Sequence, residues 1–257
     1  MQASITVSQD PAVQYLLRLG DLCLIHAQRL SEWCGHAPVL EEDIALANIA
    51  LDLIGQARGV LTCAGQIGGQ RFDEDQLAFL RPERDYRNPT LVELPRGDFA
   101  VTTVRNVMVS GLLLLLWERL RSSSDSELAG IAGKAVKEAR YHHTHALDWL
   151  LRLSDGTAES RGRVERALGM LWPYSRELFE ADAVDDAAAA AGLGPRWGDL
   201  REPWTDAMRA ALEASGWPLP TQTPFLSSGR KGIHSEHMGY ILADMQFLQR
   251  SFPGGAW

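Results

Sequence analysis

The chain has 257 residues, of which 46% are hydrophobic, and it carries a formal net charge of −8 with a pI of about 5.4. This length is enough to bury a full core in one domain or in two. Because no run of five or six like charges appears, the sequence argues against a nucleic acid as a partner.

We expect no leader peptide, membrane span or disulfide framework. The first residues lack a basic segment followed by an apolar one. The longest apolar run, 107–117, has 11 residues, whereas a helix that spans a bilayer needs about 20. Cys23, Cys34 and Cys63 are odd in number and show no CxxC spacing, so we predict reduced, small core residues. The predicted location is the cytoplasm.

Helical periodicity dominates the sequence and alternating strand patterns are almost absent, which predicts an all-α fold. The first predicted helix covers about 10–33 and ends before Gly35 and Pro38. The second begins at the acidic residues 41–43, which the positive end of the helix dipole favours, and continues to about 65. Its residues between 44 and 61 are apolar nearly all round, which predicts a central helix.

A long charged loop with three prolines is predicted over 68–97, before a second pair of helices. Asp98 can cap a third helix that ends near 122, and Ser124 or Asp125 can cap a fourth that continues to about 153. Two helix pairs joined by one long crossover are typical of a ferritin-like four-helix bundle.

Additional C-terminal helices follow Gly156. We predict helices over about 161–180, 202–215 and 235–250, with a short Ala-rich segment at 187–191. We therefore interpret 1–257 as a single ferritin-like domain, with the bundle over about 10–153 and a C-terminal helical extension over about 160–257.

The second and fourth predicted helices are where a di-iron bundle would carry its Glu-x-x-His motifs. Residues i and i+3 share one helix face, so carboxylate and imidazole can reach the same metal. The corresponding positions hold Leu53 and Gln56 in the second helix, and Ala139 and His142 in the fourth. Leu and Ala have no donor atom and an amide is a poor ligand for iron. We therefore predict no metal site and no catalytic residue in this chain.

Alternatives to this interpretation stay open. His142 could retain some metal binding, although a hydrogen-bonded core histidine with His143 and His145 as surface neighbours is favoured. An active di-iron bundle would need unusual ligands, drawn from Asp52, Glu138 and His142 with Asp21 or His26, the last two lying on either side of the apolar stretch 23–25 in the first helix. A free-standing ligand-binding or storage bundle is a third alternative.

Two further groups of polar residues are candidate sites. Asn48, Asp52 and Gln56 form an i, i+4, i+8 stripe, which we interpret as a hydrogen-bonded remnant of a metal site or as a partner-facing seam. The segment 230–237, RKGIHSEH, could form a metal site or bind a phosphate or CoA near a helix N-terminus. Capping and packing between subunits is the favoured role. The residues concerned are Arg230, Lys231, His234, Glu236 and His237.

Five stretches of the sequence resemble the C subunits of phenylacetyl-CoA epoxidases, also called phenylacetate-CoA oxygenases. They are 16–21 (LLRLGD), 28–38 (QRLSEWCGHAP), 45–58 (ALANIALDLIGQAR), 137–142 (KEARYH) and 231–239 (KGIHSEHMG). The similarity covers about residues 15–257, and strings of this length are specific.

The resemblance implies a ferritin-like structural subunit that pairs with a homologous catalytic A subunit, which holds the di-iron centre and binds phenylacetyl-CoA. It also implies a small B subunit, and a reductase with flavin and an iron–sulfur cluster that supplies electrons from NADPH. The whole complex would be an NADPH- and O₂-dependent monooxygenase of aerobic phenylacetate degradation. No catalytic residue carries over to this chain, since the C subunits of the family lack the iron ligands.

Overall fold

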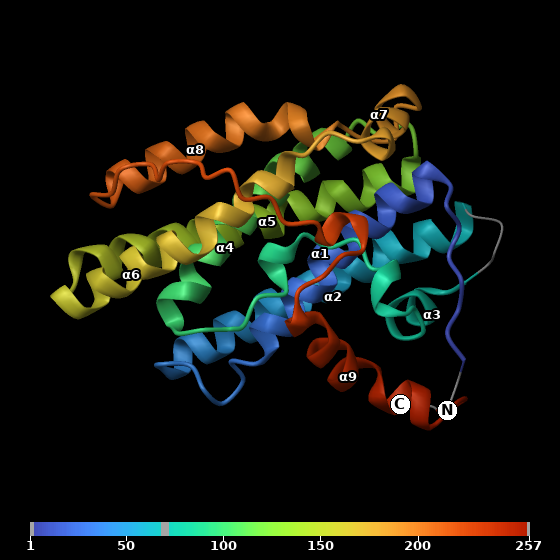
Figure 1. Cartoon of the computed structure of the whole chain (residues 1–257), viewed down its shortest axis with the longest axis horizontal. Coiled ribbons are helices and arrows are strands. Elements are labelled where there is room, and N and C mark those ends of the chain that lie inside the picture. The colour runs from blue at the N-terminus through green and yellow to red at the C-terminus, as the bar shows by residue number, and fades with distance from the viewer. Residues whose placement is uncertain (1–2, 68–71, 256–257) are drawn as a thin grey trace. The chain divides into compact units, whose positions relative to one another are not determined.

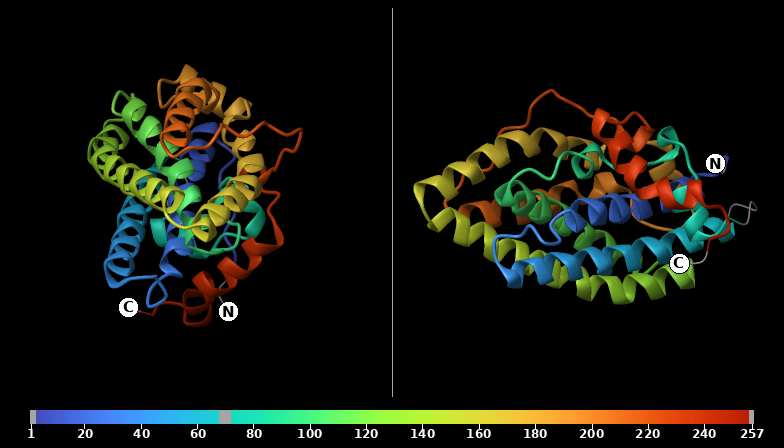
Figure 2. Two further views of the ribbon diagram at one scale, coloured as in Figure 1. Left: turned by 90° about the vertical axis from the view of Figure 1, so that its left-hand side faces the viewer. Right: turned by 90° about the horizontal axis from the view of Figure 1, so that it is seen from below.

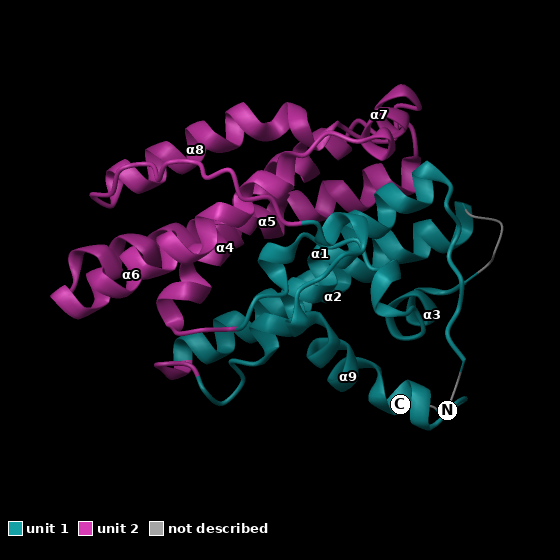
Figure 3. Ribbon diagram, in the orientation of Figure 1, with its two compact units in different colours: residues 1–36, 41–95, 228–257 teal, residues 37–40, 96–227 magenta. Residues whose placement is uncertain are grey.

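The computed structural model describes residues 3–67 and 72–255, which form helices and connecting segments without a strand (Figure 1). The all-α prediction is confirmed. The chain divides into two compact units, one made of 1–36, 41–95 and 228–257 and the other of 37–40 and 96–227 (Figure 3). The predicted four-helix bundle would combine helices of both units, so that arrangement and the single-domain organisation stay predictions.

The first unit contains the N-terminal helix pair, most of the segment that follows it and the C-terminal helix. Its α-helices are α1 (Pro11–Ser31), α2 (Leu40–Ile67), α3 (Glu74–Phe79) and α9 (Glu236–Ser251), and its 3₁₀ turns are η1 (Glu83–Asp85), η2 (Thr90–Val92) and η5 (Gly229–Lys231). The loop predicted over 68–97 is therefore partly helical. The prediction missed α3, which is only 6 residues long and is stabilised by the capping box of Asp73 and Gln76.

The second unit is built around α4, which is buried along most of its length. Its α-helices are α4 (Phe99–Leu120), α5 (Ser126–Asp155), α6 (Ala158–Leu171), α7 (Ala183–Ala190) and α8 (Arg201–Ala214), and its 3₁₀ turns are η3 (Trp172–Phe179) and η4 (Trp197–Leu200). Helix α4 packs against α5, α6 and α8. The fifth predicted helix ends early, because Pro173 has no N–H to donate and the chain continues as a 3₁₀ turn.

Helices α1 and α2 lie side by side in each view (Figures 1 and 2). Asp10 caps α1 by accepting a hydrogen bond from the backbone N–H of Ala12, 2.8 Å away. Gly20 allows close packing, since a Cβ at this position would lie 2.9 Å from Leu61 of α2. The Sγ of Cys23 lies 3.8 Å from the Gln56 side-chain oxygen. Cys23 and Cys63 are buried as predicted, but Cys34 is exposed in the turn after α1.

Helix α2 is buried on one face and exposed on the other, and its predicted central place in a bundle of both units stays a prediction. One face buries Leu46, Leu53 and Val60, whereas Ile44 and Leu51 are exposed on the other. An apolar residue at a helix position does not by itself show whether other residues of the chain cover it.

Among the described residues, α2 and α4 are long and apolar enough to cross a membrane by length and composition. In α4, 83% of the apolar window is buried inside the protein, compared with 44% in α2. Buried core helices also have this length and composition, so the two helices are weak evidence for a membrane-spanning segment.

Replacing two helical glycines, Gly65 and Gly130, by alanine should change the free energy of unfolding in opposite directions. A Cβ on Gly65 would lie 1.8 Å from the carbonyl oxygen of Phe72, so Gly65→Ala should lower the free energy of unfolding by about 1–3 kcal/mol. A Cβ on Gly130 of α5 meets no described heavy atom within 4 Å, so Gly130→Ala should raise the free energy by about 0.4–1 kcal/mol. Urea unfolding followed by circular dichroism measures both. Equal effects would contradict the close packing at Gly65.

Candidate functional site

The positions at which a di-iron bundle would carry its Glu-x-x-His ligands lie on buried helix faces. On α2, Leu53 and Gln56 are buried, and on α5, Ala139 and His142 are buried. Each pair has the i, i+3 spacing that places both side chains on one face. The inward positions of these helices are therefore occupied by a leucine, an amide, an alanine and one imidazole.

The polar stripe predicted on α2 is not buried as a whole. Asn48 is exposed, Asp52 is half-buried and only Gln56 is buried. Successive members of an i, i+4, i+8 series advance by about 40° around the helix, which turns Asn48 toward water. Of the three residues in the stripe, only Gln56 is buried, and its side-chain oxygen contacts Cys23.

Asp21 of α1 is wholly buried. Both of its carboxylate oxygens face the guanidinium of Arg81: one accepts from Nη1 at 2.9 Å, and the other pairs with Nη2. The backbone N–H of Arg87 donates to the same carboxylate at 2.8 Å. The negative charge of Asp21 is therefore balanced inside the protein by a bidentate arginine.

Arg81 organises the segment between α3 and η2. It donates from Nη1 to the Asp85 carbonyl at 3.0 Å, and its guanidinium lies 4.1 Å from the centre of the Tyr86 ring. Burial raises the pKa of the Tyr86 hydroxyl above its usual range. Gln246 of α9 donates to the Tyr86 hydroxyl at 2.8 Å and to the Arg81 carbonyl at 3.1 Å. This network thereby fixes the C-terminal helix on the same segment.

Glu93 forms a second buried centre of charge, with His234 from the segment before α9. Nδ1 of His234 lies 2.7 Å from Glu93, and Nε2 lies 3.2 Å from the Tyr86 carbonyl. The Ser235 N–H and the Asn88 amide also donate to Glu93. Burial alone would lower the pKa of His234, but the hydrogen bond and charge of Glu93 and the Tyr86 carbonyl outweigh it and raise the pKa.

Among the described residues, His234, Glu236 and His237 are not part of any group that could hold a metal ion. Arg230 is buried and Lys231 is exposed. The Glu236 side chain is largely exposed, and its carboxylate lies 3.9 Å from Nε2 of His237. Gly232 has a φ of 78°, and a Cβ there would lie 2.2 Å from the Arg84 carbonyl oxygen. Ser235 caps α9, whereas the predicted packing between subunits and the predicted phosphate or CoA contact stay predictions.

His143 differs from the surface residue that was predicted beside His142. It is half-buried, and its Nδ1 lies 3.1 Å from the Ser110 hydroxyl of α4. Burial lowers the pKa of His143, which favours a neutral imidazole. This hydrogen bond links α4 to α5 within the second unit.

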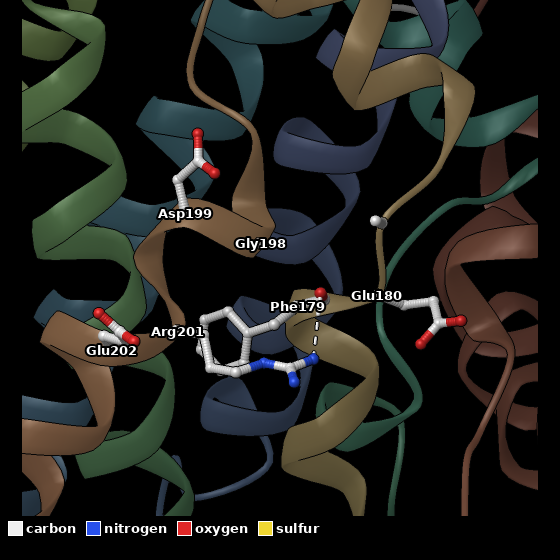
Figure 4. Close-up of a pocket in the computed structure, with 7 residues that line it drawn as sticks. Phe179, Glu180, Gly198, Asp199, Arg201 and Glu202 are labelled. Atoms are coloured by element: carbon white, nitrogen blue, oxygen red, sulfur yellow. Dashed lines mark hydrogen bonds between the residues drawn. The ribbon is translucent and has the colours of Figure 1, made fainter.

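An open hollow of about 690 Å³ lies beside η4 in the second unit (Figure 4). Its lining includes the carboxylates of Glu180, Asp199 and Glu202 and the guanidinium of Arg201. Figure 4 shows Arg201 turned toward the Phe179 carbonyl, to which it donates at 3.4 Å. With three acidic residues and one arginine in its lining, the hollow is a poor match for a phosphate-bearing ligand.

Within residues 3–67 and 72–255, no three side chains of His, Cys, Asp or Glu are grouped as they would be around a metal ion. The chemistry of the four ligand positions agrees with this, because Leu53 and Ala139 offer no lone pair. The two most deeply buried carboxylates of the first unit, Asp21 and Glu93, already have cationic or N–H partners.

Comparison with known proteins gives two matches. A family profile described as "Phenylacetic acid catabolic protein" matches residues 1–257. The chain is also 46% identical over 243 residues to a protein of Escherichia coli (strain K12) that is named as the C subunit of 1,2-phenylacetyl-CoA epoxidase. The alignment covers 95% of this chain and 98% of that relative, so it includes both compact units.

Breaking the buried pair of Arg81 and Asp21 should cost far more stability than breaking an exposed one. Arg81→Met leaves the Asp21 carboxylate buried without its counter-charge, so the free energy of unfolding should fall by about 3–5 kcal/mol. Arg58→Met breaks the exposed pair with Glu74 and should cost less than about 1 kcal/mol. Urea unfolding compares the two variants, and similar losses would show that the buried pair is not a major constraint.

The stability contributed by His234 should depend on pH. Because its pKa is raised in the folded state, the contribution is complete below the unfolded value of about 6.5 and is lost as pH rises through the folded value. The advantage of the wild type over His234→Gln should therefore be greatest below about pH 6.5 and shrink as the pH rises above that value. His36→Gln, at an exposed histidine, is the control. An advantage that grows with pH would show that the ring is neutral.

Proposed function

This chain belongs to the family of phenylacetic acid catabolic proteins, and we propose that it is the non-catalytic structural subunit of a multicomponent phenylacetyl-CoA ring-epoxidase. Its relative in Escherichia coli is named as one of the subunits of such an epoxidase, which implies a complex of several chains. Its role would be to support a catalytic subunit in aerobic phenylacetate degradation.

The observation that carries this proposal is the identity of the residues on the buried faces of α2 and α5. A pair of iron ions would need carboxylate and imidazole donors at 53, 56, 139 and 142. Only His142 is such a donor, and a single imidazole cannot hold two irons. The residues present therefore do not fit a di-iron centre, and no step of the reaction is assigned to this chain.

The contacts of Asp21 support the same conclusion. An active site with unusual ligands would need a carboxylate from α1, and Asp21 is the candidate. Its two oxygens accept hydrogen bonds from Arg81 and from the Arg87 N–H. Coordinating a metal would require Asp21 to leave Arg81, whose buried charge would then lose its partner. An active di-iron bundle with unusual ligands is disfavoured for this reason.

The partners in this proposal are a homologous catalytic A subunit, a small B subunit and a reductase. The di-iron centre, the phenylacetyl-CoA site and the oxygen chemistry are assigned to the A subunit, and this chain holds no cofactor. We place the complex in the cytoplasm. Its substrate is a soluble thioester of CoA, which suits such a location.

Replacing His142 tests the proposal in the assembled complex. His142→Ala should leave turnover per assembled complex within about 2-fold of the wild type, because an inert buried ring affects packing and not the transition state. Steady-state turnover of phenylacetyl-CoA, normalised to complex isolated by size-exclusion chromatography, measures this. His142→Gln, which keeps a hydrogen-bonding side chain, controls for loss of folding. If both variants form intact complex and lose turnover by 100-fold or more, His142 takes part in the chemistry and the proposal is wrong.

A further inference from the structure

The outer face of α2 carries a row of exposed apolar side chains. Ile44 is 55% exposed, Leu51 is 65% exposed and Ile54 is 36% exposed. Ala47, half-buried, lies between Ile44 and Leu51 on the same side of the helix. We call Ile44, Ala47, Leu51 and Ile54 the outer stripe. A row of this kind on a helix of 28 residues indicates a binding surface.

The spacing of the outer stripe suits a second helix packed along α2. Its members follow one another at intervals of three, four and three residues, which is the heptad seam of two helices packed side by side. Any face of a helix has this spacing, but a second helix crossing at about 20° would meet each residue of the seam in turn. This geometry favours a helix as the occupant.

Gly55 adds independent evidence for close approach. It lies one turn after Leu51, in the interior of α2, where glycine costs about 1 kcal/mol relative to alanine. A Cβ at Gly55 would meet no described heavy atom within 4 Å, so packing inside this chain does not explain the glycine. A neighbouring helix that comes close to the backbone at this point does explain it.

The charges beside the outer stripe distinguish a different chain from a second copy. Glu41, Asp43 and Asp52 border it, while the guanidinium of Arg58 is paired with Glu74 at 2.9 Å. The chain as a whole carries a net charge of −8. Two copies joined along this face would bring acidic rims together, whereas a partner helix with Lys or Arg beside its apolar seam would complement them.

We propose that the outer stripe of α2 is a docking surface for a helix of the catalytic subunit, one with a matching apolar heptad seam and basic flanks. The assignment rests on the proposed function for the existence of that partner, and on the structure for the surface. It places the binding surface on one side of α2 and the altered ligand positions Leu53 and Gln56 on the other.

The test measures binding of the full chain to the purified catalytic subunit by surface plasmon resonance. The double variant Ile44→Gln, Leu51→Gln changes only exposed side chains and should weaken binding at least about 100-fold with an unchanged melting temperature. Gly55→Leu should weaken binding at least about 10-fold, yet raise the melting temperature by about 2 °C, because leucine is the better helix former. Opposite changes in binding and stability are what a folding defect cannot produce.

Matched controls keep the result specific. Tyr240→Gln removes an equally exposed apolar side chain from α9, and Gly130→Leu fills an equally open helix position on α5. Both should bind as the wild type does. Binding that survives the outer-stripe variants, or that is lost equally in the controls, overturns the docking surface while the proposed function stands.

Two other outcomes also overturn the assignment. If the wild-type chain alone forms dimers in sedimentation and the double variant is monomeric, the occupant is a second copy. If the wild-type chain does not bind the catalytic subunit at all, the proposed function fails, and the partner named for the outer stripe fails with it.

Discussion

The ion pair of Asp21 and Arg81 is the constraint on which the first compact unit depends. Both side chains are fully buried, so neither charge can be relieved by water and each requires the other. The pair fastens the segment after α3 to the middle of α1. Through the Arg81 carbonyl and the Tyr86 hydroxyl, Gln246 then attaches α9 to that segment. His234 and Glu93 add a second buried contact between the same parts of the chain.

This arrangement also bears on the proposed non-catalytic role of the chain. A helical bundle binds iron when its inward carboxylates are paired with a metal, and here the inward carboxylate of α1 is paired with an arginine. The faces of α2 and α5 that would complete the site instead bury Leu53 and Ala139, which contribute packing and no donor atom. In the proposed function, these helices contribute core packing and no metal ligand. Such a subunit is well suited to hold a catalytic homologue in place.

Local signals in the sequence predicted the helices well, because periodicity and caps such as Asp98 and Asp125 act over a few residues. They also placed His142 and Leu53 on inward faces. The contacts that organise the first unit were missed, since Arg81 lies 60 residues from Asp21 and His234 lies 141 residues from Glu93. No pattern within a helix reveals such a pairing. The exposure of Leu51 was missed for a different reason: hydrophobicity does not indicate whether the covering residues belong to the same chain.

The absence of iron from this chain is the central claim, and anomalous X-ray scattering tests it most directly. Data collected on either side of the iron absorption edge, from crystals of the assembled complex, locate every iron atom independently of enzyme activity. The account predicts anomalous peaks inside the catalytic subunit and none among the helices of this chain. A pair of peaks beside His142 or Gln56 would contradict it.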